Sequence, residues 1–113
     1  MQLAASNSGL PLFIGIDQEG GRVARLPRAE YAAFSGNMTI GATYHSYKTH
    51  YANAVGQAIG QQLYDLGFNL NFAPNVDVNN NPNNPVINVR SFGDNSEVVG
   101  MLGQAMSEGM RSA

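Results

Sequence analysis

Residues 12–25 read LFIGIDQEGGRVAR, and this segment sets the expected architecture of the chain. Its first part is a continuous apolar run, which is typical of a strand buried on both faces of a parallel sheet. The run stops abruptly at two acids, two glycines and two arginines. In parallel α/β folds, functional residues gather in the loops that follow the strands. The charged candidates at this predicted strand end are Asp17, Glu19, Arg22 and Arg25.

The clearest helical pattern lies between residues 46 and 66. Val55, Ile59, Leu63 and Leu66 recur at spacings of four, four and three, which places them on one helix face. Gly67 follows as a natural left-handed cap. Glycines 56 and 60 are either tolerated in this helix or permit close packing on a sheet.

A second strand and a second long helix follow. In residues 68–78, aromatic and aliphatic side chains first alternate with amides, which predicts a strand whose apolar face meets helices. Residues 79–85 are rich in Asn and Pro and predict a loop. Residues 96–111 predict a helix that Asn95 or Ser96 caps. Its apolar stripe is Val98, Leu102, Met106 and Met110.

The expected order is the end of a helix over residues 1–6, a strand, a long loop over 22–44, a helix, a strand, a loop and a helix. This βαβα order implies parallel strands and a right-handed crossover. The fold class is therefore α/β. Because a (β/α)₈ barrel takes about 250 residues, the pattern indicates roughly a quarter to a third of one, cut at both ends. We expect residues 1–113 to be a fragment of a single barrel domain.

Composition excludes several classes of function. The 113 residues carry a net charge of −2 and no basic block, so there is no electrostatic case for binding nucleic acid or an anionic membrane surface. No apolar run approaches the roughly 18 residues of a membrane span. The chain has no Cys, which excludes disulfides and thiolate metal sites. These features leave the compartment open between the bacterial cytoplasm, the periplasm and secretion.

Asp17 and Glu19 are two positions apart and would point to the same face of a strand. Two close carboxylates could divide acid and base roles, as in retaining glycosidases, whose carboxyl groups lie about 5–5.5 Å apart. The alternative is a polar strand end in which the acids pair with Arg22 or Arg25. The sequence leaves both interpretations open.

The other titratable residues carry weaker signals. His45 and His50 are five positions apart, about 140° around a helix, so they would not share a ligand face. Solvated histidines are the better interpretation. Asp77 is expected to anchor the Asn-rich loop, and a lone arginine such as Arg90 is more often structural. No glycine-rich phosphate loop is present.

Several short motifs together resemble glycoside hydrolase family 3, in its β-N-acetylhexosaminidase branch. They occur in order over nearly the whole chain: GIDQEGGRV (15–23), GNM (36–38), GAT (41–43), LGFNLNFAP (66–74), DVN (77–79), NP (81–82) and RSFG (90–93). The resemblance implies a (β/α)₈ catalytic domain. It also implies retaining hydrolysis of terminal β-linked N-acetylglucosamine, from glycans or peptidoglycan fragments, without metal or organic cofactor. Ser35, where a proline is usual, departs from the pattern only in the local loop.

The resemblance also assigns roles. The first acid of its D-x-E-G-G-R motif holds sugar hydroxyls and is not the nucleophile, and this role falls on Asp17. Two further sugar contacts fall on Arg25 and Arg90. Glu19 and Arg22 become scaffolding of the barrel rim, so the pairing of Asp17 with Glu19 as acid and nucleophile is demoted.

The resemblance assigns no catalytic residue to these 113 residues. The family's acid/base histidine lies in a K-H-F-P-G-H-G-type loop, and its nucleophilic aspartate lies further on. Neither motif occurs here, so His45 and His50 do not inherit the role, and the isolated chain is expected to be inactive. One alternative is a carbohydrate-binding module that uses the same three residues without chemistry. Another is a self-associating fragment, since two parallel strands leave unpaired edges.

Overall fold

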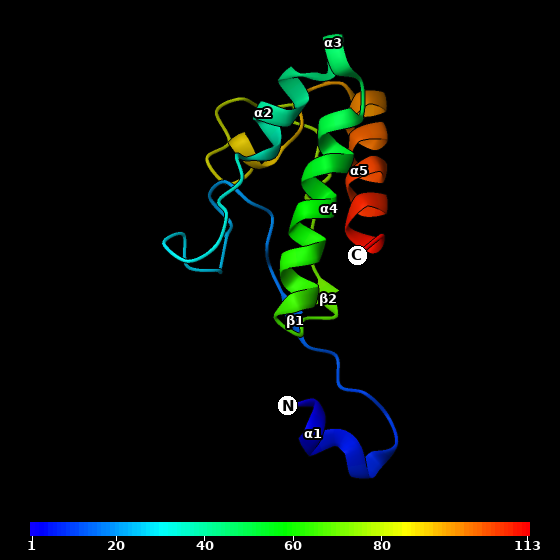
Figure 1. Ribbon diagram of the computed structural model, residues 1–113. Coiled ribbons are helices and arrows are strands. Elements are labelled where there is room, and N and C mark those ends of the chain that lie inside the picture. The colour runs from blue at the N-terminus through cyan, green and yellow to red at the C-terminus, as the bar shows by residue number, and fades with distance from the viewer.

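The computed structural model describes residues 1–113, in which two long helices pack side by side and a small parallel sheet lies at one end of them (Figure 1). Strand β1 (Gly15–Ile16) pairs with β2 (Leu70–Asn71), with Gly15 opposite Leu70 and Ile16 opposite Asn71. Helix α4 (His50–Asp65) lies between the strands in sequence, and α5 (Ser96–Arg111) follows β2. The predicted βαβα order with parallel strands is confirmed.

Both strands are shorter than the sequence predicts, because side-chain amides replace part of the backbone ladder. The Ile14 N–H donates to Asn69 Oδ1 at 2.7 Å, and Asn69 Nδ2 donates to the Leu12 carbonyl at 2.8 Å. Asn71 makes the equivalent pair of bonds to the backbone of Gln18, at 3.0 and 3.1 Å. The two segments therefore remain joined from residue 12 to residue 18, although only two residues of each form a regular strand.

The predicted apolar face of β2 does not all meet helices. Phe68 is half-buried, but Leu70 is 37% exposed and Phe72 is 64% exposed. The prediction is wrong for these two side chains, because α4 and α5 pack mainly on each other. The core contains residues from α2, both long helices and the segment before α5, namely Ile40, Ala52, Phe92, Val99, Leu102, Ala105 and Met106.

Glycines allow α4 and α5 to approach closely. A methyl group on Gly56 would lie 2.3 Å from the Met106 carbonyl oxygen, and one on Gly109 would lie 2.3 Å from the Asn53 carbonyl oxygen. Across the same contact, Asn53 Nδ2 donates to the Ala105 carbonyl at 3.1 Å. The glycines of α4 thus serve close packing, but against a helix and not against the sheet.

The α5 prediction is confirmed at both ends, from Ser96 to Arg111, and Asn95 Oδ1 accepts the Val98 N–H at 3.1 Å as its cap. The helix expected from residue 46 is interrupted. A short α3 (Tyr44–Tyr47) ends at Lys48, whose φ of 52° is left-handed, and α4 begins at His50. Gly67 has a φ of 85°, as expected for a left-handed cap.

The long segment after β1, which was expected to be a loop, contains a helix, α2 (Asn37–Ala42). A 3₁₀ turn, η2 (Asn88–Arg90), lies against α2. A methyl group on Gly41 would overlap the Phe92 carbonyl oxygen, so α2 contacts this segment through backbone.

The N-terminal residues lie apart from the body (Figure 1). They form α1 (Gln2–Ala5) and the 3₁₀ turn η1 (Ser6–Ser8), which agrees with the predicted helix end. The molecule measures 49 × 27 × 27 Å, and its radius of gyration of 15.1 Å exceeds the roughly 13 Å expected of a compact domain of this length. None of the helices in the described part of the chain is long and apolar enough to cross a membrane.

Replacing Gly56 with alanine tests the helix contact. Gly56→Ala is expected to lower the free energy of unfolding by about 1–3 kcal/mol, because the new methyl group must displace the Met106 backbone. Gly100→Ala is the matched control in α5, where a methyl group meets no atom within 4 Å. The unfolding free energy of this control variant is expected to exceed that of the wild-type chain by up to about 1 kcal/mol, because alanine favours the helix over glycine. Urea unfolding followed by circular dichroism measures both, and equal stability of the two variants would contradict the close contact.

Candidate functional site

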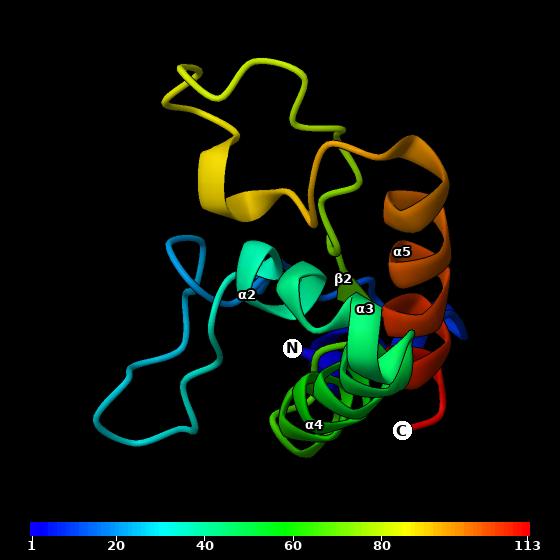
Figure 2. The ribbon, with the colours of Figure 1, turned by 90° about the horizontal axis from the view of Figure 1, so that it is seen from above.

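Three segments, around Gly21, Gly36 and Val89, meet beyond the carboxyl ends of the strands. Glycines allow their backbones to touch. A methyl group on Gly21 would lie 2.7 Å from the Cα atom of Gly36, and one on Gly36 would lie 2.7 Å from the Val89 carbonyl oxygen. Gly20 and Gly21 also have left-handed φ angles, of 90° and 56°. The loops at residues 20–36 and 76–90 project from the helices in Figure 2. This backbone contact brings the loop after β1 beside η2.

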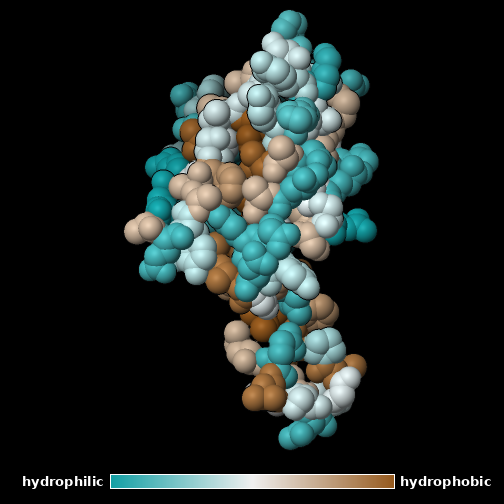
Figure 3. Space-filling model, in the orientation of Figure 1, coloured by the Kyte–Doolittle hydropathy of each residue, from teal (hydrophilic) through white to brown (hydrophobic). Residues whose placement is uncertain are grey.

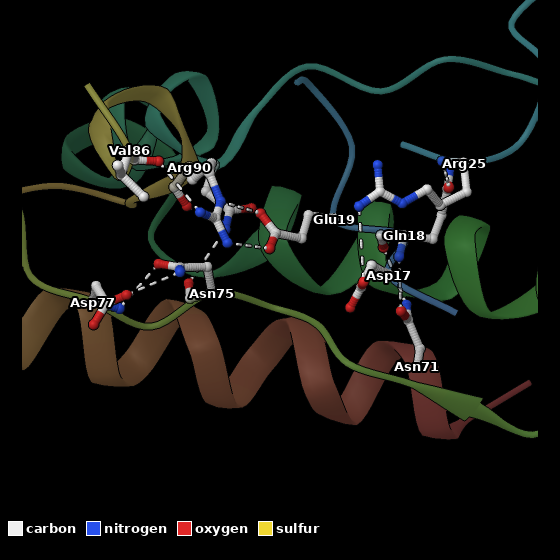
Figure 4. Close-up of polar contacts among 10 residues, drawn as sticks. Asp17, Gln18, Glu19, Arg25, Asn71, Asn75, Asp77, Val86 and Arg90 are labelled. Carbon is white, nitrogen blue, oxygen red and sulfur yellow. Dashed lines mark hydrogen bonds and ion pairs between the residues drawn. The ribbon is translucent and has the colours of Figure 1, made fainter. Parts of the chain in front are cut away.

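Glu19 and Arg90 form a two-bond ion pair at this junction (Figure 4). Arg90 Nε donates to Glu19 Oε2 at 3.0 Å, and Nη2 donates to Oε1 at 2.9 Å. The Glu19 side chain is 7% exposed and that of Arg90 is 26% exposed. Neither Arg22 nor Arg25 pairs with Glu19, so the predicted partner of this acid is wrong.

Further bonds hold the Arg90 segment in place. Nη1 of Arg90 donates to the Val86 carbonyl at 3.2 Å. The Arg90 carbonyl accepts from Nδ2 of the buried Asn37 at 2.9 Å. The hydrogen bonds that Arg90 donates to Glu19 raise the pKa of Arg90 above its ordinary value; partial burial opposes this, and the charges of Glu19, Asp77 and Asp17 add to it. The guanidinium therefore stays charged while it is fixed.

Asp17 and Arg25 form a looser pair on the other side of the site. Arg25 Nη2 lies 3.8 Å from Asp17 Oδ2, beyond hydrogen-bond length, and the side chains are 59% and 52% exposed. Gln18 lies between the two acids and is buried; its Oε1 accepts the backbone N–H groups of Arg25 at 2.7 Å and Leu26 at 3.2 Å. The backbone beside the exposed pair is thus held by a buried amide.

Asp17 and Glu19 do not act as a pair of facing acids. Strand β1 ends at Ile16, and the two carboxylates are directed to different arginines in Figure 4. The alternation expected along a strand does not apply to residues beyond its end. The interpretation that these acids pair with Arg22 or Arg25 is confirmed for Asp17, whose partner is Arg25, and is wrong for Glu19, whose partner is Arg90.

The predicted anchoring of the Asn-rich loop at Asp77 is confirmed for its backbone and not for its carboxylate. Its Oδ2 accepts from Asn75 Nδ2 at 3.0 Å, and its carbonyl accepts from Ser91 Oγ at 2.6 Å, which closes the base of the loop. His45 and His50 are both exposed, on α3 and at the start of α4. Among the described residues, no three His, Cys, Asp or Glu side chains come together as a group that could hold a metal ion.

The sequence identified Asp17, Glu19, Arg25 and Arg90 but missed two supporting amides, Gln18 and Asn37. Both are buried polar residues inside short motifs, and each bonds to backbone of another segment. Gln18 stands between two acids in the strand-end motif, which was the available signal. The sequence contains no comparable signal for Asn37, because its partners Asn75 and Arg90 are far away in sequence.

Chemically, the site offers hydrogen-bonding groups of two kinds, the fixed guanidinium of Arg90 and the exposed side chains of Asp17 and Arg25. Asp17 supplies exposed carboxylate acceptors, while Arg25 and Arg90 supply planar sets of donors. Such groups suit a ligand with several adjacent hydroxyls, since each hydroxyl both donates and accepts. Glu19 is less available, because Arg90 occupies both of its oxygens.

Comparison with known proteins gives a consistent family. The model "Glycosyl hydrolase family 3 N terminal domain" matches residues 1–113. Beta-hexosaminidase A of Pseudoalteromonas piscicida is 59% identical over 108 residues, which cover 96% of this chain and 18% of that protein. The solved structure of a glycoside hydrolase family 3 β-N-acetylglucosaminidase from Paenibacillus sp. str. FPU-7 matches with a TM-score of 0.89 and 44% identity, over 99% of this chain and 21% of that one.

NagZ from Neisseria gonorrhoeae, solved in complex with N-trifluoroacetyl-D-glucosamine, matches with a TM-score of 0.81 and 30% identity, over 89% of this chain and 30% of that one. The chain therefore spans about a fifth to a third of the length of these relatives. The predicted fold class, an α/β part of a barrel-type catalytic domain, agrees with these matches.

The two ion pairs are expected to differ in their contribution to stability. Arg90→Met leaves the Glu19 carboxylate buried without its partner and is expected to cost about 3 kcal/mol of unfolding free energy. Arg25→Met removes an exposed pair and is expected to cost less than about 1 kcal/mol. The midpoints of urea unfolding of the two variants, compared at an unchanged dependence of the unfolding free energy on urea concentration, measure both losses. Similar losses in the two variants would show that the Glu19–Arg90 pair does not hold the loops together.

Proposed function

Because this chain belongs to glycosyl hydrolase family 3, we propose that it supplies one sugar-binding wall of a retaining β-N-acetylhexosaminidase. The substrate of the whole enzyme is a terminal β-linked N-acetylglucosamine, on a glycan or a peptidoglycan fragment. Asp17, Arg25 and Arg90 make the sugar contacts. The observation that carries the proposal is the position of these three residues, beyond the strand ends and with polar atoms left open.

The Asp17–Arg25 pair is open to a ligand. At 3.8 Å the two side chains attract each other without saturating their hydrogen-bonding groups. A pair of neighbouring sugar hydroxyls can donate to the Asp17 carboxylate and accept from the Arg25 guanidinium, and such charge-assisted bonds are the stronger class. Asp17 therefore acts in binding and orientation.

The relatives support the choice of sugar. NagZ from Neisseria gonorrhoeae is solved with N-trifluoroacetyl-D-glucosamine, and the Paenibacillus structure is of a β-N-acetylglucosaminidase. The residues matched in this chain include the strand-end motif and the segment around Arg90. We assign the same class of sugar to this site.

Cleavage of the glycosidic bond requires groups other than those in residues 1–113. A retaining mechanism needs a nucleophile and an acid/base flanking the bond. Glu19 is buried with both oxygens bonded to Arg90, so it cannot reach an anomeric carbon. His45 and His50 lie on α3 and α4, and His50 packs edge-on against Tyr51. On its own, the chain is expected to bind the sugar without hydrolysing it.

Titration with N-acetylglucosamine, followed by NMR of the backbone amides, tests this function. Shifts are expected at residues 17–25 and near residue 90. Asp17→Asn is expected to weaken binding by roughly tenfold or more, because a charge-assisted bond becomes a neutral one. Asp65→Asn is the matched control, since Asp65 bonds only Gln61 at the end of α4.

The same protein is then incubated with an aryl N-acetylglucosaminide. No release of phenol above a buffer blank is expected. Turnover by the wild-type chain would overturn the assignment of roles, and equal binding by the Asp17→Asn and Asp65→Asn variants would remove Asp17 from the site.

We also propose that the 113-residue chain self-associates through the exposed side of β2. Phe72 is 64% exposed, and a hollow of about 490 Å³ beside β2 is lined by apolar residues that include Leu63, Phe68, Leu70 and Met110. In Figure 3, apolar surface gathers where the body narrows toward the N-terminal segment. An exposed apolar face next to a free strand edge favours association.

Light scattering at increasing concentration tests this association. The wild-type chain is expected to exceed its monomer mass of 12.1 kDa. Phe72→Lys is expected to return it toward the monomer, because it places a charge on the apolar face. Tyr47→Lys, at an exposed position on α3, serves as the control. A monomeric wild-type chain at high concentration would contradict the proposal.

A further inference from the structure

The Glu19–Arg90 pair leaves a defined set of donors for a ligand. A guanidinium has five N–H groups. Glu19 takes one from Nε and one from Nη2, and the Val86 carbonyl takes one from Nη1. Two N–H groups therefore remain, one on each terminal nitrogen, and the side chain is still 26% exposed. These two donors are the part of Arg90 that a ligand can use.

We propose that Glu19 is a positioning residue that aims these donors and cancels the charge of Arg90, so that the site selects neutral sugars over anionic ones. The inference rests on the function proposed above and adds the basis of its specificity. Glu19 touches Arg90 and not the sugar. Its role is therefore distinct from that of Asp17.

The positioning is rigid because both partners are fixed at their backbones. The Glu19 N–H donates to the Val23 carbonyl at 2.9 Å, inside the tight turn that Gly20 and Gly21 allow. The Arg90 N–H donates to the Ile87 carbonyl at 2.8 Å, and the Arg90 carbonyl is held by Asn37. Two parallel bonds between a planar carboxylate and a planar guanidinium then fix the plane of Arg90.

The charges around Arg90 disfavour an anion. Glu19, Asp77 and Asp17 all act on the Arg90 guanidinium, and Glu19 bonds it directly. Of the other arginines of this loop, Arg25 lies beside its own acid, Asp17, and Arg28 donates to the Gly21 carbonyl. A phosphate or carboxylate on the ligand therefore meets an Arg90 whose charge a bonded carboxylate already compensates, whereas a neutral hydroxyl can accept the free N–H groups. Removing the Glu19 charge would expose the cation of Arg90.

The test compares N-acetylglucosamine with N-acetylglucosamine 6-phosphate, a neutral and an anionic form of one sugar, by NMR titration at low salt. In Glu19→Gln, binding of the neutral sugar is expected to weaken and the preference for it over the phosphate to fall, by roughly tenfold. Glu19→Asp keeps the charge and is expected to retain the preference. Glu108→Gln is the control for loss of one carboxylate, since Glu108 bonds only Gln104 on α5.

A separate readout reports on positioning without any sugar. The Arg90 Nε–H resonance, assigned by its loss in Arg90→Lys, is expected to exchange slowly with water in the wild-type chain and fast in Glu19→Gln. Fast exchange in the wild type, or an unchanged neutral-to-anionic preference in a folded Glu19→Gln that binds the sugar, overturns this inference. If the wild-type chain fails to bind N-acetylglucosamine, the proposed function is contradicted. The inference of charge selection, which rests on that function, then fails as well.

Discussion

The ion pair between Glu19 and Arg90 joins residues 71 positions apart, and the arrangement of the site depends on it. It connects the loop after β1 to the 3₁₀ turn before α5. The contact is possible only because glycines let the intervening backbones touch, at Gly21, Gly36 and Gly41. A methyl group at any of these positions would meet backbone of the neighbouring segment at less than 3 Å, so that segment would have to shift.

The helices explain why these loops emerge on one side. Gly56 and Gly109 bring α4 and α5 into direct backbone contact, so both helices pack as one layer. The sheet itself contributes little, with two residues per strand. Asn69 and Asn71 extend it by bonding to the backbone of the other segment. The loops that carry the candidate site are thus positioned by helix packing and side-chain amides more than by a long ladder.

Local features of the structure were predictable from the sequence, whereas long-range partners were not. The bounds of α5 and its Asn95 cap follow from nearby residues, and so does the left-handed Gly67. The strand lengths were overestimated because an amide that replaces a backbone bond is indistinguishable in sequence from a surface Asn. The partner of Glu19 could not be found, since a nearby arginine is the simpler expectation. The family resemblance gave Asp17, Arg25 and Arg90 together, and the structure places all three in ion pairs, Asp17 with Arg25 and Arg90 with Glu19.

The two ion pairs have different roles in the site because one is buried and the other is exposed. The Glu19–Arg90 pair is short and largely buried, so its Coulomb attraction is weakly screened and its geometry is fixed. The Asp17–Arg25 pair is long and open to solvent, so it contributes little to stability and keeps its polar groups available. The proposed binding role requires both properties, because a ligand is oriented by groups that are held in place and still have free hydrogen-bonding atoms. The residue that joins the two pairs is Gln18, whose buried amide fixes the backbone of Arg25 while its own backbone is held by Asn71.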